Sequence, residues 1–257
     1  MENKTVLITG ASGGIGREFA YIFAQKKYNL VLVARSKDKL DQIAKDCTTL
    51  YGIKTTVFTH DLSNPESAEL LYQDVQENRI SIDVLINNAG FGQFGPFAKS
   101  DLTKNMEMIN LNVTTLVALT SLFVRDMVAR NQGQILNIAS TAAFQPVPNF
   151  AVYGATKAFV LSFTEALHYE LKDTKVSVSV LCPGPTSTGF EQAADMKDSK
   201  LFKSGVMDAK TVAKIGFNGL QKNKMTVVPG LKNKVLATAS NMTPSRDLLV
   251  WITAKMS

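Results

Sequence analysis

Cysteine and histidine are scarce in this 257-residue chain, which has two of each. Cys47 and Cys182 form no close-spaced motif and cannot build a disulfide framework. His60 and His168 lie far apart, and nothing near either of them suggests a set of metal ligands. The sequence therefore argues against a disulfide-rich scaffold, and we expect no metal site.

Long apolar runs are also missing. No stretch reaches the roughly 18 consecutive apolar residues expected of a membrane span, and no basic segment followed by a long apolar stretch opens the chain, as it would in a secretory signal. The composition, 45% hydrophobic and 19% charged, is that of a globular protein rather than a disordered or fibrous one. We expect a protein of the reducing cytoplasm, without membrane contact.

Acidic residues are few in the late part of the chain. Between Lys197 and Lys234 there are nine lysines against Asp198 and Asp208, and the formal net charge of the chain is +6. A solvated surface explains this excess most simply. The alternative is attraction for an anionic ligand, such as the phosphates of a dinucleotide. The basic residues are scattered and no aromatic-rich motif accompanies them, so we expect no nucleic-acid partner.

What the chain does have is a regular alternation of short apolar runs and amphipathic stretches. The runs are rich in Val, Ile and Leu without strict alternation, as in strands covered on both faces. The expected strands are Lys4–Thr9, Asn29–Ala34, Lys54–Thr59, Asp83–Asn87, Gln134–Ala139, Val176–Leu181 and Met225–Val228. The expected helices are Gly14–Lys27, Lys37–Gly52, Pro65–Asn78, Leu102–Arg130, Ala151–Lys172 and Ala209–Lys222.

Residues at the helix boundaries fit this assignment. Asn64-Pro65 offers a cap followed by proline at the first helical position, and Asp208 can cap the last of these helices. Gly52 and Gly133 follow helices where a left-handed residue is common. The pattern predicts one α/β domain over residues 1–257, a doubly wound seven-stranded parallel sheet with helices on both faces. In such a sheet, ligands bind beyond the carboxyl ends of the strands.

A glycine-rich turn joins the first strand to the first helix. Glycines there let the backbone turn tightly and approach a pyrophosphate, which the helix N-terminus then binds. A tight turn uses glycine anyway, but the position between the first strand and the first helix favours a dinucleotide. The expected cofactor-binding residues of this turn are Gly10, Ser12, Gly13, Gly14, Ile15 and Gly16.

The end of the second strand indicates which dinucleotide is preferred. An acidic residue there would bond the ribose 2′-hydroxyl of NAD, whereas a cation would accept a 2′-phosphate. This strand is followed by Arg35, and no carboxylate occurs before Asp38. Arg35 is suited to a phosphate dianion, with Ser12 adding a hydroxyl. The simpler alternative is a solvated arginine. We predict a preference for NADP(H) over NAD(H).

The glycine turn has the spacing Gly-x-x-x-Gly-x-Gly, and further motifs follow it in order. They are Asn87-Asn88-Ala89-Gly90, then Ser140 after the fifth strand, then Tyr153-Gly-Ala-Thr-Lys157. Together these motifs, spread from Lys4 to about Gly230, resemble the short-chain dehydrogenase/reductase family. The resemblance implies a single Rossmann-fold domain that interconverts a carbonyl and a secondary alcohol with a nicotinamide cofactor.

Tyr153 and Lys157 lie four residues apart, so on a helix they share one face. An ammonium beside the phenol would lower the pKa of Tyr153 from about 10 toward neutrality. Tyr153 could then give a proton to a carbonyl oxygen or take one from an alcohol. Ser140 would hydrogen-bond the same oxygen. An exposed helix pair is the structural alternative.

The resemblance implies further site residues. Lys157 would also bind the nicotinamide ribose, and Asn110 would hold a water for proton relay, although Asn112 is a possible substitute. Asp61 and Leu62 would contact the adenine. The remaining expected cofactor contacts are Asn87, Ala89 and Gly90 on the adenosine side, Pro183 and Gly184 over the nicotinamide, and Thr188 at its carboxamide. A plain turn is the alternative for the Pro183–Thr188 segment.

The substrate side has fewer signals. Six phenylalanines near strand ends could line an apolar pocket or simply pack: Phe91, Phe94, Phe144, Phe150, Phe190 and Phe202. The stretch 189–205 resembles the family's substrate lid. For the basic tail, residues 231–257, we rank packing on the domain first, a subunit interface second and a membrane surface third.

We expect an apolar small-molecule carbonyl or alcohol substrate, and the family implies a homodimer or homotetramer. A dinucleotide-binding regulatory protein without turnover is the alternative, although it would not need Ser140, Tyr153 and Lys157. A third possibility is another enzyme on this scaffold, such as an epimerase, but the short C-terminal region leaves little room for a large substrate domain.

Overall fold

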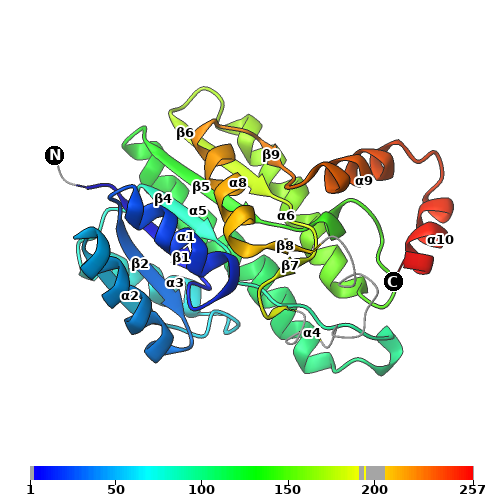
Figure 1. Ribbon diagram of the computed structural model, residues 1–257, viewed down its shortest axis with the longest axis horizontal. Helices are drawn as coiled ribbons and strands as arrows, with labels where there is room; N and C mark the ends of the chain where they lie inside the picture. Colours follow the sequence, from blue (N-terminus) through cyan, green and yellow to red (C-terminus); the bar gives the residue numbers. More distant parts are fainter. Residues whose placement is uncertain (1–2, 191–193, 195–205, 257) are drawn as a thin grey trace.

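The computed structural model describes residues 3–190, 194 and 206–256. Its centre is a parallel sheet of seven strands in the order β3-β2-β1-β4-β5-β6-β9 (Figure 1). The strands are β1 (Thr5–Thr9), β2 (Asn29–Ala34), β3 (Thr55–Thr59), β4 (Val84–Asn87), β5 (Gly133–Ile138), β6 (Val176–Leu181) and β9 (Thr226–Val227). Each corresponds to an expected strand, so the fold predicted from the sequence is confirmed.

Helices cover both faces of this sheet. On one face lie α1 (Gly14–Gln25), α2 (Lys37–Tyr51) and α8 (Ala209–Gln221), and on the other lie α3 (Ser67–Glu77), α5 (Leu116–Ala129) and α6 (Ala151–Glu170). Successive residues of β1 point to opposite faces: Val6 and Ile8 belong to one core cluster and Leu7 to the other. Burial on both faces explains why the strands are continuous apolar runs.

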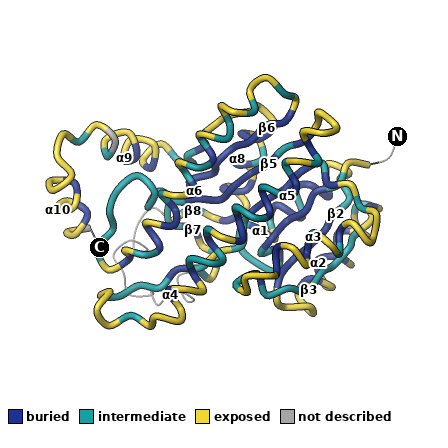
Figure 2. Tube along the Cα trace, turned by 180° about the vertical axis from the view of Figure 1, so that it is seen from behind, coloured by how far each residue is buried: buried dark blue, intermediate teal, exposed yellow. Residues whose placement is uncertain are grey.

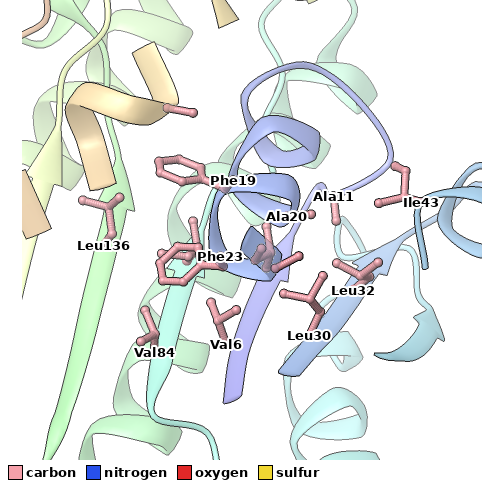
Figure 3. Packing of buried hydrophobic residues seen from close by; sticks show 14 of the residues in the cluster. Val6, Ala11, Phe19, Ala20, Phe23, Leu30, Leu32, Ile43, Val84 and Leu136 are labelled. Carbon is pink, nitrogen blue, oxygen red and sulfur yellow. The ribbon is translucent and has the colours of Figure 1, made fainter. Parts of the chain in front are cut away.

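Aromatic side chains of α1 fill the centre of the first face. Phe19 and Phe23 are fully buried and lie above the strands that carry Val6, Val84 and Leu136 (Figure 3). Burying a side chain of this size contributes about 1.5–3 kcal/mol. The first helix is therefore firmly fixed on the sheet, and so is the glycine turn that leads into it.

Helix ends agree with the sequence at two boundaries and differ at two. The Asp208 carboxylate accepts a hydrogen bond from the Thr211 amide at 2.8 Å, and Gly52 is left-handed with φ 64°. At the other two, α3 begins only at Ser67, so Asn64-Pro65 forms the preceding turn rather than the cap. The left-handed residue after α5 is Asn131, with φ 49°, and not Gly133, whose missing side chain instead makes room for Met127.

The expected long helix Leu102–Arg130 is interrupted. It consists of α4 (Leu102–Ile109), a π-helical segment η2 (Asn110–Thr115) and α5. Such insertions are rare and often occur at functional sites. The stretch Leu102–Ala129 is long and apolar enough to cross a membrane, with mean hydropathy 1.4. The core helix of a soluble protein passes the same test, and here α5 packs on α3, β4 and β5.

Smaller elements complete the described chain. The strands β7 (Thr186–Ser187) and β8 (Met207–Asp208) form a separate pair, and single turns η1 (Phe97–Lys99) and η3 (Thr141–Ala143) follow β4 and β5. Two last helices, α9 (Leu231–Met242) and α10 (Arg246–Met256), stand out from the body at the end away from the N-terminus (Figure 1). They are mostly exposed (Figure 2).

Candidate active site

The carboxyl edge of the sheet carries two adjoining cavities. The central cavity, about 400 Å³, lies beside the ends of β1, β4, β5 and β6, and the outer cavity, about 470 Å³, beside the ends of β1, β2 and β3. Both are lined by Gly10, Ser12, Ala89, Gly90 and Phe91. The sheet reverses its strand order between β1 and β4, which is where ligands bind in doubly wound folds.

The glycine turn forms the shared wall of the two cavities. A side chain at Gly16 would lie 2.3 Å from the Gly10 carbonyl oxygen, so only glycine allows this close packing. A side chain at Gly13 would meet nothing within 4 Å, and the N-terminus of α1 has no side-chain cap. An open helix N-terminus with unpaired N–H groups suits a pyrophosphate. The turn therefore fits the dinucleotide that its sequence predicts.

Asn88 holds the turn to the end of β4. Its side-chain amide donates to the Thr9 carbonyl at 2.9 Å and to the Gly10 carbonyl at 3.3 Å. The Thr9 hydroxyl in turn accepts hydrogen bonds from the backbone amides of Asn88 and Ala89, each at 3.0 Å. We did not assign a role to Asn88 from the sequence, although it occupies the second position of the Asn-Asn-Ala-Gly motif.

Asn87, expected on the adenosine side, is placed differently. Its side chain is buried inside the sheet and donates to Thr120 at 3.0 Å and to Asn137 at 2.9 Å. Asn137 continues to Thr164 on α6 at 3.0 Å. The Asn87 side chain therefore ties β4 to β5 and α5 instead of facing a ligand, a correction to the expectation. An alternating strand sends consecutive residues to opposite sides, so Asn87 and Asn88 cannot both face the cavity.

Arg35 and Asp61 face each other across the outer cavity. The Arg35 guanidinium is largely exposed, and one of its nitrogens lies 3.9 Å from a carboxylate oxygen of Asp61. Burial raises the pKa of Asp61, but hydrogen bonds from Ser63 and the charge of Arg35 outweigh it and lower the pKa overall. Leu62 and Ser36 complete this wall. A loosely paired, exposed arginine is available to a phosphate.

Ser140, Tyr153 and Lys157 meet in the central cavity, as the sequence predicts. Ser140 follows β5 and hydrogen-bonds the phenol of Tyr153. The Lys157 ammonium lies 5.7 Å from the centre of the Tyr153 ring and donates to the Ile138 carbonyl at 2.9 Å. Ser140 follows β5 and the other two residues lie on α6, and the buried Asn137–Thr164 bond holds β5 and α6 together.

The pKa values of Tyr153 and Lys157 differ from the expectation that Lys157 lowers the pKa of the Tyr153 phenol toward neutrality. Burial raises the pKa of Tyr153 to about 12, although the Ser140 hydrogen bond lowers it. Burial also lowers the pKa of Lys157 to about 8. Lys157 therefore does not bring the phenol toward neutrality in the protein alone, because the loss of water disfavours both charged forms. The phenol remains protonated at neutral pH.

The structure places Asn112, rather than Asn110, against the cavity wall. The Asn112 side chain is buried, donates to the Phe91 carbonyl at 2.9 Å and accepts from the Phe91 amide at 3.2 Å. It also donates to Thr156 at 3.1 Å. Neither asparagine is among the described residues that line the two cavities, but Asn112 bonds Phe91, which lines both of them. The tertiary structure therefore favours the alternative asparagine.

The loop after β6 forms the far wall. Pro183, Gly184 and Thr188 all line the central cavity. A side chain at Gly14 would lie 2.9 Å from Cβ of Thr188, so Thr188 sits beside the start of α1. The Pro183 carbonyl accepts from the Thr141 amide at 2.8 Å, which fixes this loop to the residue after Ser140.

Apolar side chains enclose the remaining side. Phe91, Phe150 and Phe190 line the central cavity, and Phe150 stacks on the Tyr153 ring with centroids 4.2 Å apart. Phe94 packs behind Phe150, whereas Phe144 belongs to a different core cluster. Phe202 and nearly all of the expected lid 189–205 lie outside the described residues. Gln145 and Val147, which we did not assign from the sequence, also line this cavity.

The family model for short chain dehydrogenases matches residues 4–199. This chain belongs to that family. The motif order and the meeting of Ser140, Tyr153 and Lys157 agree with this membership. The protein is thus an NAD(P)-dependent short-chain dehydrogenase/reductase that acts on CH–OH or C=O groups.

Curated relatives of this short-chain dehydrogenase are reductases and dehydrogenases. Ketoacyl reductase HetN from a Nostoc species is 34% identical, with 97% of this chain and 82% of that protein covered. A very-long-chain 3-oxoacyl-CoA reductase from Anas platyrhynchos is 33% identical, over 87% of this chain and 71% of its own length. The 17-beta-hydroxysteroid dehydrogenase type 3 of Mus musculus is 30% identical, with 93% and 76% covered.

Solved structures share the whole fold. A short-chain dehydrogenase from Sphingobium yanoikuyae in complex with NADPH superposes with a TM-score of 0.84 at 32% identity, covering 92% of this chain and 93% of that one. A relative from Burkholderia phymatum in complex with NAD reaches 0.83 at 25% identity, with 92% of each chain covered. Similar structures thus hold either nicotinamide dinucleotide.

Proposed function

We propose that this short-chain dehydrogenase reduces an apolar ketone or aldehyde with NADPH, using Tyr153 as the proton donor. The observation that supports this is the buried Tyr153 phenol, bonded to Ser140 and facing a cavity that begins at the glycine turn. A bound nicotinamide supplies the hydride. The chain's own residues would hold the carbonyl and supply the proton.

Ser140 and Tyr153 would both donate hydrogen bonds to the substrate carbonyl oxygen. Two donors aimed at one oxygen stabilise the negative charge that develops there. Tyr153 would then release its proton to that oxygen, because an alkoxide is far more basic than a phenol. Lys157, buried below the tyrosine ring, would stabilise the phenolate left behind. A phenol with a pKa of about 12 begins this step in the protonated form that reduction requires.

Arg35 supports the preference for NADP(H). Its guanidinium is exposed at the outer cavity, is held only loosely by Asp61, and has Ser36 beside it. A doubly charged 2′-phosphate would replace the long contact to Asp61 with direct charge-assisted hydrogen bonds. Asp61 itself remains ionised, and it lies on the adenine side of the cavity.

The wall of the central cavity supports an apolar substrate. Phe91, Phe150, Phe190 and Val147 line the central cavity together with Tyr153, and Gln145 is a polar group among them. The relatives include reductases of 3-oxoacyl substrates and hydroxysteroid dehydrogenases by name. The first name describes a carbonyl on a long acyl chain and the second a hydroxyl on a steroid, and the extended apolar part of both molecules fits this wall.

A screen of NADPH oxidation tests the proposal. The panel contains hydrophobic ketones, aldehydes, 3-oxoacyl thioesters and steroids, with NADH run in parallel and small charged sugars as the control class. We expect turnover of hydrophobic carbonyls with NADPH at a higher kcat/KM than with NADH. Turnover confined to charged sugars would contradict the substrate class, and equal use of NADH would contradict the cofactor preference.

A further inference from the structure

The last two helices, α9 and α10, form an arm, defined here as residues 231–256, that is attached to the domain by one narrow side. Asn233, Ala237, Leu249 and Thr253 are its buried residues. Among the described residues, Ser240 donates to Gln145 at 3.0 Å and Thr253 donates to the Pro146 carbonyl at 2.8 Å. Figure 1 shows both helices standing out beyond the sheet and its covering helices.

The opposite side of α10 is apolar and exposed. Leu248, Trp251 and Ile252 follow the spacing i, i+3, i+4 and therefore share one face. Their side chains are 45%, 57% and 39% exposed. Leu249 and Thr253, on the side of α10 that packs on the domain, are almost completely buried. An exposed stripe of large apolar residues on a helix that already packs elsewhere marks an interaction surface.

The exposed side of α9 repeats this pattern. Leu231 and Val235 lie one turn apart and are 78% and 59% exposed, and Met242 near the end of the helix is 77% exposed. Figure 2 shows both helices as mainly exposed segments with short buried portions. The two helices thus offer apolar surface over the whole length of the arm.

Positive charges flank the apolar residues. The arm carries Lys232, Lys234, Arg246 and Lys255, against Asp247 as its single acidic residue. The Lys255 ammonium lies 3.6 Å from the centre of the Trp251 ring, so a cation and an aromatic ring meet at the end of the stripe. Tryptophan and lysine side chains of this kind favour the boundary between water and lipid.

We propose that the arm binds the surface of an anionic lipid bilayer, with Leu248, Trp251 and Ile252 entering the interface. The basic residues would pair with acidic headgroups, because lysines and arginines close to the membrane surface are attracted to an anionic leaflet. A second copy of the chain fits this surface less well. In a two-fold interface the same surface meets itself, so the four basic residues of one arm would face and repel the four basic residues of the other arm.

This binding differs from the expectation that the membrane is not contacted and that the tail mainly packs on the domain. It is compatible with a cytoplasmic location, because the arm lies on a bilayer and does not span it. Through Gln145 and Pro146 the arm touches the loop that lines the central cavity. Delivery of an apolar carbonyl from the bilayer to that cavity would rest on the proposed function, but binding itself does not.

Trp251 is the only tryptophan of the chain, so its fluorescence reports on the arm alone. Vesicles of phosphatidylcholine with phosphatidylserine are added to the whole protein, and vesicles of phosphatidylcholine alone serve as the comparison. We expect a blue shift of the Trp251 emission and co-sedimentation of the protein with the anionic vesicles, both weakened by added salt. No turnover is measured, so failure of the proposed reaction would not affect this result.

Two variants locate the contact. Leu248→Glu combined with Trp251→Glu should weaken co-sedimentation roughly tenfold or more, and Lys232→Glu with Lys234→Glu by about fivefold per lysine. The matched controls lie on α2: Leu50→Glu removes a leucine that is 67% exposed, and Lys39→Glu with Lys45→Glu removes two exposed lysines. Circular dichroism checks that all variants are folded.

Several results would overturn the proposal. One is an unchanged Trp251 emission with anionic vesicles, and another is equal binding to both vesicle types. Equal binding by the arm variants and the wild type would place any membrane contact elsewhere. If light scattering instead shows an oligomer that the Leu248→Glu and Trp251→Glu variant loses, and no vesicle binding occurs, then the stripe is a subunit contact.

Discussion

The two ends of the site are built by different means. The cofactor end, around the glycine turn and the outer cavity, is shaped mainly by backbone: Gly16 lies against the Gly10 carbonyl, and Asn88 bonds the same turn. The substrate end is shaped by side chains, with Phe150 stacked on Tyr153 and Phe190 beside them. Backbone geometry restricts the residues it accepts, whereas an apolar wall accepts many. A motif therefore identifies the cofactor end, and no motif identifies the substrate.

The sharpest test of this division is at Tyr153, where the two ends meet. Tyr153→Phe keeps the ring that stacks on Phe150 and removes only the phenol oxygen. We expect kcat for carbonyl reduction to fall by roughly 10²–10⁴-fold, while the Kd for NADPH, measured by fluorescence titration, changes little. Wild-type activity in this variant would reject the acid role of Tyr153.

A substitution at Arg35 should act on the cofactor end alone. Arg35→Asp removes a charge-assisted contact worth about 1.5–3 kcal/mol and adds repulsion, so we expect KM for NADPH to rise roughly 10–100-fold. KM for the carbonyl substrate should stay the same, because the substrate wall contains no residue from this strand end. Steady-state kinetics with NADPH and NADH measure both values. An unchanged KM for NADPH would remove Arg35 from the cofactor site.

Asn112 and Asn110 provide a matched pair between the two ends. Asn112→Ala would leave the partly buried amide and carbonyl of Phe91 without their partner, which should lower the free energy of unfolding by about 1–3 kcal/mol. Asn110→Ala should change it by no more than about 0.5 kcal/mol. Urea unfolding followed by circular dichroism compares them. If both variants lose the same free energy of unfolding, Asn110 is again a candidate for the asparagine of the site.

An effect of comparable size is a pH dependence of stability caused by Lys157. Its folded pKa of about 8 lies below the unfolded value of 10.5, so the unfolded chain binds more protons between these values. Lys157 should therefore contribute a rise in the free energy of unfolding with pH from 8 to 10, of at most about 1.4 kcal/mol per unit. The raised pKa values of Cys47, Cys182 and Tyr153 act in the opposite direction, the two thiols above about pH 9 and Tyr153 above about pH 10.

Lys157→Met should remove the contribution of Lys157 and so make the slope less positive than in the wild type, because it replaces the buried ammonium with an apolar side chain of similar length. Urea unfolding of the cofactor-free protein at several pH values between 8 and 10 measures the slope. Lys172→Met, which removes an exposed lysine, should leave the slope as in the wild type. Equal slopes in the wild type and in Lys157→Met would mean that Lys157 is not buried as a cation.

The order of strands and helices could be predicted from the sequence because both depend on local patterns. Runs of Val, Ile and Leu without alternation predict strands covered on both faces, and seven such runs became the seven strands of the sheet. Helix ends were less predictable. Asn64-Pro65 suits a helix start locally, but its turn places Ser67 as the first helical residue. That the chain forms one domain and that it is cytoplasmic both stay predictions.

At the site, the sequence by itself determined the glycine turn and the pair Tyr153 and Lys157, because spacing along a single element sets their relative positions, and the family resemblance added Ser140 to this pair. Only the tertiary structure decided between Asn110 and Asn112, and between Asn87 and Asn88. The members of each pair are close neighbours in the sequence, and which of them bonds the residues that line the cavities depends on a π-helical insertion or on the direction of the chain at the end of β4. Burial, which raises the pKa of Tyr153 against the effect expected from Lys157, likewise arises only when distant segments pack together.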